Sequence, residues 1–302
     1  MNEVYNYIKE ESIGRVEKNV KMSKYTTYRV GGICKYMVFP KTVNCLIKLI
    51  KIIDKYSVKY KVIGSGSNLL FSDDIYDGFI IKLDELKDLE FVSPTKIKVG
   101  AGYSLIKLSY LLAKNGLTGL EFASGIPGTV GGAIFMNAGA YKSDMGYVVT
   151  EVKVLTPKYK VITLVNKELD FHYRTSFLQK NPGYICLDAT IKLEHGNKKV
   201  IEEVITDRKK RRIESQPLEY PSAGSVFRNP KDMFAGKLVE DLGFKGMKIG
   251  GALVSDKHAN FIVNYDNAKA SDIKSLIDQI KDKVKEECDI DLKVEQELVN
   301  WE

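Results

Sequence analysis

Apolar residues recur at helical spacing in several stretches of the chain. The clearest patterns are Val43, Leu46, Ile47, Ile50 and Ile53; Leu105, Leu108 and Leu112; and Ile273, Leu276, Ile277, Ile280 and Val284. They predict helices over residues 41–56, after Ser104 as an N-cap, and from Ser271 onward. Two further helices are expected at 197–215 and 235–243.

Short aliphatic and β-branched runs between these helices predict strands. They cover residues 61–64, 78–83, 96–102, 149–156, 161–164, 184–194, 260–264 and 291–300. Strands and helices mix without strict βαβ alternation, which favours an α+β fold over a doubly wound sheet. The composition changes where the 197–215 helix ends, and we place the main domain boundary there.

Composition narrows the class of protein. The chain has 302 residues, 44% of them hydrophobic and 28% charged, which is typical of a globular protein with room for two or three domains. No apolar run is long enough to span a bilayer, and the charged N-terminus is unlike a secretory signal, so we expect a cytoplasmic protein without a membrane partner. Four cysteines far apart in the sequence and three histidines favour neither disulfides nor a metal site.

The net charge of +7 is mild, and "DRKKRR" (207–212) is the one dense basic run. Its basic residues fall around several faces of the expected helix and have no aromatic residues between them. We therefore interpret the run as a solvated helix end and expect no nucleic-acid partner. The charge excess also suits an acidic small molecule.

Two glycine-rich stretches are candidates for ligand binding. "VIGSGSN" (62–68) ends a strand in a turn whose N–H groups and serine hydroxyls could surround phosphate oxygens, although a tight turn without a ligand explains it equally well. It matches neither the G-x-G-x-x-G fingerprint nor the P-loop. "GIPGTVGGAIFMNAGAY" (125–141) could place backbone against a flat ligand, with Asn137 as a polar contact. Close packing of a helix on a strand is the alternative.

Taken with "TTYRVGG" (26–32), these stretches resemble the FAD-binding domain of the UDP-N-acetylenolpyruvoylglucosamine reductase family, within the vanillyl-alcohol-oxidase-like flavoproteins. The resemblance continues through "FHYRTS" (171–176), "YPSAGSVFRNP" (220–230), residues 235–264 and "LKVEQELV" (292–299). It implies a two-lobed FAD-binding domain of the vanillyl-alcohol-oxidase/PCMH type, followed by a smaller α+β substrate-binding domain. The expected bounds are 1–88 and 89–205 for the two lobes and 206–302 for the last domain.

The resemblance implies an NADPH-dependent flavoenzyme of peptidoglycan precursor synthesis. In this family NADPH reduces FAD, which passes hydride to C3 of the enolpyruvyl group of UDP-N-acetylglucosamine enolpyruvate and yields UDP-N-acetylmuramate. By this likeness Ser225 gives the proton to C2, while Arg174 and Glu295 stabilise the enolate. Glu297 would share a strand face with Glu295, and the family pattern favours Glu295.

Further residues follow from the same resemblance. The residues implied to contact FAD are Gly64, Ser65, Gly66, Ser67, Asn68, Leu69, Ser124, Gly125, Ile126, Pro127, Gly128, Thr129, Gly131, Gly132, Asn137, Ala138 and Gly139. Arg228 and Asn229 are implied to contact the nucleotide-sugar part of the substrate. Lys237 and His258 lie in family-like segments without an assigned chemical step. The sequence departs from the family at "AYKSDM" (140–145).

The chain looks like the shorter, type II subtype, and we expect a monomer. One alternative is another oxidoreductase of the same flavin superfamily, against which the C-terminal segments argue. Another alternative is a non-catalytic nucleotide-binding or nucleic-acid-binding protein. That hypothesis accounts for neither flavin colour nor the set of Arg174, Ser225 and Glu295.

Overall fold

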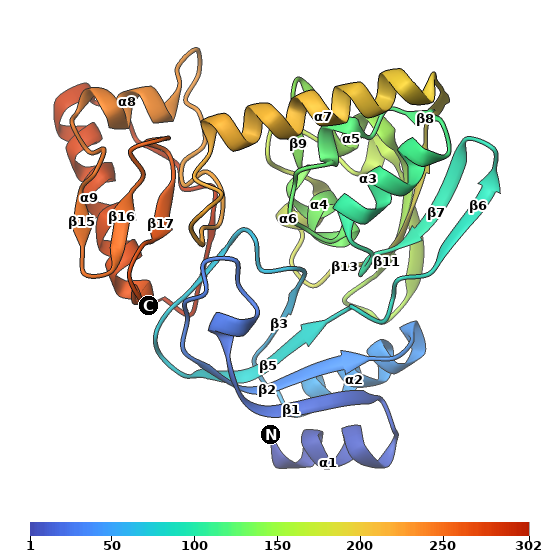
Figure 1. Ribbon diagram of the computed structural model, residues 1–302. Coiled ribbons are helices and arrows are strands. Elements are labelled where there is room, and N and C mark those ends of the chain that lie inside the picture. Colours follow the sequence, from blue (N-terminus) through green and yellow to red (C-terminus); the bar gives the residue numbers. More distant parts are fainter. Residues whose placement is uncertain (302) are drawn as a thin grey trace. The chain divides into compact units, whose positions relative to one another are not determined.

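The computed structural model describes residues 1–301, and its chain forms two compact units (Figure 1). Unit 1 contains residues 1–18, 36–65 and 78–210, and unit 2 contains 19–35, 66–77 and the chain from 211 onward. Each unit is thus assembled from segments far apart in the sequence. The sequence instead predicts three continuous domains, with boundaries after residues 88 and 205. These boundaries stay a prediction.

Unit 1 contains most of a four-stranded sheet in the order β1-β2-β5-β3. Its strands are β1 (Gly14–Lys21), β2 (Ile33–Pro40), β3 (Tyr60–Ile63) and β5 (Tyr76–Lys82), with β3 parallel to β5. Helices α1 (Asn2–Glu10) and α2 (Val43–Lys55) pack beside it (Figure 1). The Thr42 side chain caps α2 by accepting from the Cys45 N–H at 3.2 Å. Ile50 and Ile53 of α2 are buried against the sheet.

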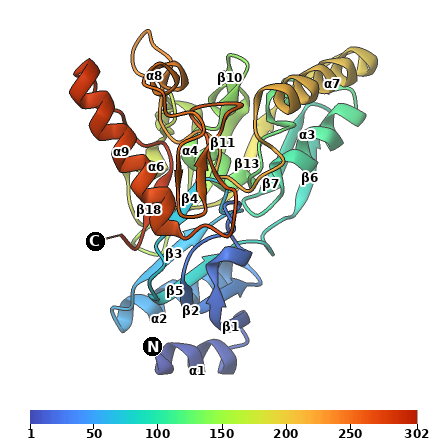
Figure 2. The ribbon, with the colours of Figure 1, turned by 60° about the vertical axis from the view of Figure 1, so that its left-hand side comes forward.

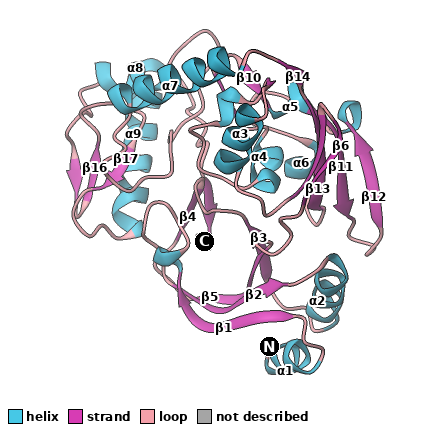
Figure 3. Cartoon of the chain, turned by 45° about the vertical axis from the view of Figure 1, so that its right-hand side comes forward, coloured by secondary structure: helices cyan, strands magenta, loops and turns pink. Residues whose placement is uncertain are grey.

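A second sheet of unit 1 is antiparallel and has the order β12-β11-β13-β7-β6 (Figure 3). Its strands are β6 (Leu89–Ser93), β7 (Lys96–Gly100), β11 (Val149–Leu155), β12 (Val161–Val165) and β13 (Ile185–Lys192). Helices α3 (Leu105–Lys114) and α4 (Val130–Met136) lie against it, and α7 (Lys198–Ser215) follows it in the chain. The shorter elements are β8 (Leu117–Thr118), β9 (Gly139–Ala140), β10 (Ser143–Asp144), β14 (Glu194–His195), α5 (Met145–Val148), α6 (Phe177–Lys180), and the 3-10 turns η2 (Glu121–Ala123) and η3 (Asn166–Glu168).

Unit 2 is built around the long helix α9 (Ala270–Cys288), which packs on an antiparallel sheet of three short strands (Figure 1). These strands are β15 (Lys248–Ile249), β16 (Ala252–Val254) and β17 (Ile262–Asn264), with α8 (Ala235–Asp241) nearby and the 3-10 turn η1 (Met22–Lys24) in an N-terminal segment. Ile273, Ile277 and Ile280 of α9 are fully buried. The last strand, β18 (Glu297–Val299), pairs in parallel with β4 (Leu69–Phe71) (Figure 2).

The helices predicted from the sequence are confirmed at the expected positions as α2, α3, α7, α8 and α9, although α7 has no distinct apolar face and buries Ile201 and Ile205 near its start. Ser104 accepts a hydrogen bond from the Lys107 N–H, as expected of an N-cap. The long C-terminal strand expected at 291–300 is wrong: only Glu297–Val299 forms a strand, and Val294 makes a single bridge to Phe227. Within residues 1–301, no helix combines the length and the apolar character that crossing a bilayer requires.

Candidate functional site

The first glycine-rich turn leaves the end of β3 and passes from unit 1 into unit 2. Gly66 has a φ of 68°, and a Cβ there would lie 2.0 Å from the Tyr25 carbonyl oxygen. The Thr27 N–H donates to the Gly66 carbonyl at 3.2 Å. The "TTYRVGG" segment therefore lies directly against this turn, and only glycine fits at residue 66.

A buried lysine supports the same turn from within unit 1. Lys82, at the end of β5, is 6% exposed, and its Nζ donates to the Gly64 carbonyl at 2.6 Å. Burial lowers the pKa of Lys82, and the Asp84 carboxylate at 3.4 Å offsets part of that effect. A cation held this close to a glycine-serine turn favours an anionic ligand there.

The second glycine-rich stretch contains a helix that sequence patterns did not predict. Helix α4 begins after Thr129, whose Oγ1 accepts from the Gly132 N–H at 3.3 Å. The Gly131 N–H donates to the Ala101 carbonyl at 2.8 Å, and a Cβ on Gly131 would lie 2.9 Å from the Ala101 Cβ. Part of this small-residue stretch is therefore explained by close packing of a helix on the end of β7, the alternative left open above.

The two glycine-rich stretches meet at Gly64 and Thr129 within unit 1. A Cβ on Gly64 would lie 2.6 Å from the Thr129 Oγ1. Gly128 differs, because no heavy atom lies within 4 Å of the position its Cβ would take. Packing inside the protein requires glycine at 64 and 131 but leaves open space at 128. A surface this poor in side chains fits the close approach of FAD to the backbone.

Arg174 lies in a tight turn of unit 1, between His172 and Thr175. His172 and Thr175 exchange two backbone hydrogen bonds of 3.1 Å, and Arg174 between them has a left-handed φ of 56°. Such a conformation is unfavourable for arginine and persists only where the surroundings impose it. The Ser176 Oγ, fully buried, donates to the Phe135 carbonyl of α4 at 2.8 Å. The turn is thus attached to the helix of the second glycine-rich stretch.

Ser225 and Glu295 lie on adjacent segments of unit 2. The Glu295 N–H donates to the Val226 carbonyl at 2.8 Å, and Phe227 bridges Val294. The Asn68 Nδ2 donates to the Glu295 carbonyl at 3.0 Å, which links this pair to the first glycine-rich turn. Arg174 belongs to unit 1, so the structure brings together two of the three predicted catalytic residues within one unit.

Sequence patterns missed Gln296, which follows the predicted catalytic residue Glu295 in the chain. The Gln296 side chain is 4% exposed, whereas Glu295 and Glu297 on either side of it are partly exposed. The Gln296 Oε1 accepts from the buried Tyr28 hydroxyl at 3.0 Å, and its Nε2 donates to the Gly224 carbonyl at 3.2 Å. Burial raises the pKa of Tyr28, which keeps this hydroxyl a donor. No local pattern in the sequence links Gln296 to Tyr28, because the two residues are 268 positions apart.

The other predicted residues of unit 2 have separate environments. The Arg228 Nε is buried and has no hydrogen-bond partner among residues 1–301. Asn229 is exposed, and its Oδ1 accepts from the Ala235 N–H at the start of α8 at 3.0 Å. Lys237 pairs with Asp241 on the surface. 

His258 has a structural environment. Its Nδ1 accepts from the Asn260 N–H at 3.2 Å, and burial lowers the pKa of His258. Asn260 in turn exchanges two side-chain hydrogen bonds with the backbone of Phe227. In the described part of the chain, no group of three His, Cys, Asp or Glu residues could hold a metal ion.

Comparisons with known proteins first identify the class of protein to which the chain belongs. Residues 34–164 match the family model described as an FAD binding domain. Alkyldihydroxyacetonephosphate synthase shares the fold at 14% identity, with a TM-score of 0.50 over 65% of this chain and 40% of that one. The protein is an FAD-dependent oxidoreductase with a PCMH-like α+β fold.

Longer matches define the family. Residues 216–299 match the C-terminal domain of UDP-N-acetylenolpyruvoylglucosamine reductase. UDP-N-acetylenolpyruvoylglucosamine reductase 1 of Bacillus cereus is 46% identical and that of Bacillus subtilis 42%, each over 99% of both chains. The crystal structure of the Thermus caldophilus reductase matches with a TM-score of 0.82 and 33% identity, covering 95% of this chain and 99% of that one. The chain belongs to the UDP-N-acetylenolpyruvoylglucosamine reductase family, as the sequence motifs predicted.

Proposed function

We propose that this protein uses NADPH to reduce UDP-N-acetylglucosamine enolpyruvate to UDP-N-acetylmuramate, a precursor of peptidoglycan. The proposal is supported by full-length similarity to reductases named for this substrate. The observation that carries it is the pairing of the Ser225 and Glu295 segments beside Asn68 in unit 2. A proton donor and a carboxylate on neighbouring segments suit the reduction of an enolpyruvyl double bond.

When bound along residues 64–69 and 124–139, FAD would supply hydride chemistry for reduction of the enolpyruvyl group at C3. We assign the Ser225 hydroxyl as the donor of the proton to C2. Arg174 provides a fixed guanidinium that can bind the substrate carboxylate through two hydrogen bonds and stabilise the enolate. Glu295 assists in stabilising this intermediate.

FAD would be held by the two glycine-rich stretches, residues 64–69 and 124–139. The Lys82 ammonium group supports the first of them by donating to the Gly64 carbonyl. Arg228 and Asn229 are assigned to the nucleotide-sugar part of the substrate. The buried Arg228 Nε without a partner supports this assignment, because an anionic oxygen would satisfy it. Since NADPH and a UDP-linked sugar are soluble cytoplasmic molecules, the proposal places the enzyme in the cytoplasm. We also propose a monomer, because one chain supplies every residue given a role.

The test is an anaerobic visible spectrum of the purified protein, with NADPH added first and UDP-N-acetylglucosamine enolpyruvate second. We expect an oxidised flavin spectrum that bleaches with NADPH and returns with the enolpyruvyl substrate. A protein that bleaches and stays reduced would contradict the proposed substrate. A protein that cannot be reconstituted with FAD would contradict the whole proposal.

A further inference from the structure

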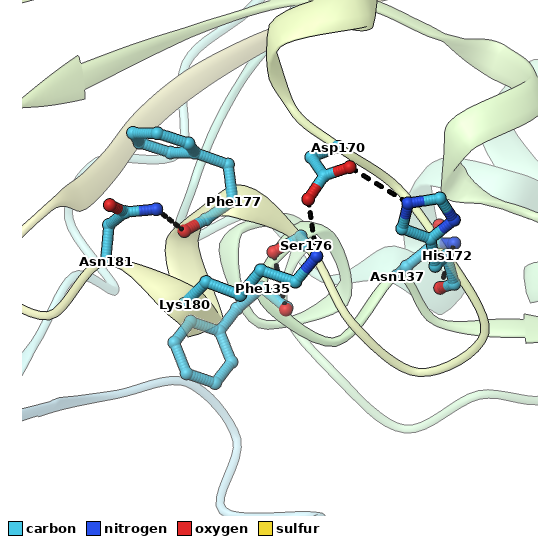
Figure 4. A network of polar contacts seen from close by, with 8 residues as sticks. All are labelled: Phe135, Asn137, Asp170, His172, Ser176, Phe177, Lys180 and Asn181. Carbon is cyan, nitrogen blue, oxygen red and sulfur yellow. Dashed lines mark hydrogen bonds and ion pairs between the residues drawn. The ribbon is translucent and has the colours of Figure 1, made fainter.

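The side chain of Asn137 is buried and bonded within the protein. Asn137 follows the last turn of α4, is 2% exposed, and has a left-handed φ of 42°. Its Nδ2 donates to the His172 carbonyl at 2.9 Å (Figure 4), and its Oδ1 accepts from the Gly146 N–H at 3.0 Å. Because both ends of the amide are engaged, a contact between Asn137 and FAD would be made by its backbone.

The carbonyl that Asn137 binds is the one that closes the Arg174 turn. The His172 carbonyl also accepts from the Thr175 N–H, and these two donors occupy its two lone pairs. A left-handed conformation is unfavourable for arginine, so the turn must be held by its surroundings. Asn137 holds it on one side of Arg174 and Ser176 on the other, both through the C-terminal end of α4 (Figure 4).

The surface ion pairs near this turn are weaker candidates for the same task. The His172 ring contacts the Asp170 carboxylate at 2.9 Å, and Lys180 contacts the other oxygen of Asp170 (Figure 4). The three side chains are 46% to 65% exposed, and exposed ion pairs stabilise a turn little because water screens the charges. The buried amide of Asn137 is therefore the stronger restraint on the turn.

We propose that Asn137 is a positioning residue, which fixes Arg174 relative to the FAD-binding stretch through the His172 carbonyl. The inference rests on the proposed function only for the role of Arg174 in stabilising the enolate. It assigns Asn137 to the half-reaction in which substrate is reduced, and not to the half-reaction in which NADPH reduces the flavin.

Asn137→Asp removes the donor of this hydrogen bond but adds a carboxylate beside Asp144, whose Oδ1 also accepts from the Gly146 N–H, so Asn137→Gly is measured with it to remove the donor without adding a charge. Aspartate keeps an acceptor for the Gly146 N–H and tolerates the left-handed conformation, but it has no donor for the His172 carbonyl. We expect reoxidation of the reduced flavin by the enolpyruvyl substrate to slow by about 10- to 100-fold, while reduction by NADPH changes by less than about threefold. Asn181→Asp is the matched control, because the Asn181 Nδ2 donates to the Phe177 carbonyl at 2.8 Å, away from the turn. In this variant both rates should stay at the wild-type level.

A double variant shows whether Asn137 acts through Arg174. In an Arg174→Ala background, Asn137→Asp should slow reoxidation by less than about twofold more, because the group it positions is gone. Should Asn137→Asp fail to retain FAD, the test rests on Asn137→Gly, since glycine adopts the left-handed conformation without strain.

Three results would overturn the inference. Asn137→Asp could reoxidise its flavin at the wild-type rate, or it could slow flavin reduction and flavin reoxidation equally. In the third result, Asn137→Asp would slow reoxidation as much in the Arg174→Ala background as in the wild-type protein. The wild-type protein separates this failure from failure of the proposed function. If wild type itself is not reoxidised by the enolpyruvyl substrate, the proposed function fails first.

Discussion

The contact between Gly64 and Thr129 makes Gly64→Ala a quantitative test of how the glycine-rich stretches fit together. The new Cβ would lie 2.6 Å from the Thr129 Oγ1, roughly 0.8 Å short of the 3.4 Å at which ordinary contact begins. Threonine is β-branched, so its hydroxyl cannot move without rotating the whole side chain. Rotation would break the hydrogen bond from the Gly132 N–H that caps α4.

The expected magnitude follows from these two responses. Loss of a threonine N-cap costs about 1 kcal/mol, and accommodating one extra methyl group without rotation costs about 1–3 kcal/mol. We therefore expect Gly64→Ala to lower the free energy of unfolding by about 1–2 kcal/mol. In a Thr129→Ala background the nearest remaining contact is the residue 129 Cβ at 3.6 Å. There the added cost of Gly64→Ala should fall within about 0.5 kcal/mol of zero.

The assay is thermal unfolding of the FAD-free protein, followed by far-ultraviolet circular dichroism. Fluorescence of Trp301, the single tryptophan, is less suitable because that residue belongs to unit 2. A loss of 1 kcal/mol should lower the melting temperature by about 2 °C in a chain of this size. Additive losses in the double variant would refute the reasoning, because they would mean that Gly64 and Thr129 do not share a contact.

Gly128→Ala completes the comparison. Open space around residue 128 predicts an unchanged melting temperature without FAD. If FAD lies against this position, the stabilisation on adding FAD should fall in Gly128→Ala. An unchanged response to FAD would remove residue 128 from the proposed cofactor surface.

Three further predictions concern unit 2. Ser225→Ala should leave reduction of the flavin by NADPH intact in stopped-flow measurements and slow reduction of the substrate at least about 100-fold; unchanged turnover would exclude Ser225 as proton donor. Gln296→Leu should lower the free energy of unfolding by about 1–3 kcal/mol in urea titrations because the buried Tyr28 hydroxyl loses its acceptor, and adding Tyr28→Phe should recover part of the loss. The pKa of His258 is lowered in the folded state, so the unfolded chain binds the extra proton. Stability should therefore decline as the pH falls below about 6.5, by at most about 1.4 kcal/mol per pH unit from this residue. His258→Asn, which keeps an acceptor for the Asn260 N–H, should lose that part of the pH dependence; an identical pH profile would contradict it.

Periodicity in the sequence predicted the long helices because their burial is set by local spacing. Helix α9 buries Ile273, Ile277 and Ile280 at the spacing expected of an amphipathic helix. Helix α4 was missed, because glycine and alanine carry no amphipathic signal and its position depends on contacts with the end of β7. The C-terminal strand was predicted too long, since apolar residues scattered along residues 291–300 do not reveal which of these residues find a partner strand.

The candidate site was predicted in part through the resemblance and could not be completed from sequence. Motifs identified the Ser225 and Glu295 segments, and the structure places them next to each other. Lys82 was absent from the prediction because its function depends on the Gly64 carbonyl, which lies 18 positions away in the sequence. Gln296 is linked to Tyr28 across 268 positions, and no local pattern indicates such a pair.

The pairing of β18 with β4 has a consequence for synthesis on the ribosome. The Trp301 Nε1 donates to the Leu70 carbonyl, across 231 positions of the chain, and the Glu297 N–H donates to the Asn68 carbonyl. The segment after the first glycine-rich turn therefore cannot pair with its partner strand until residues 297–301 have left the exit tunnel. Since a contact of this sequence separation closes late and slowly, a nascent chain that stops before residue 297 cannot complete unit 2, and deletion of residues 297–301 removes a strand from beside the proposed cofactor turn.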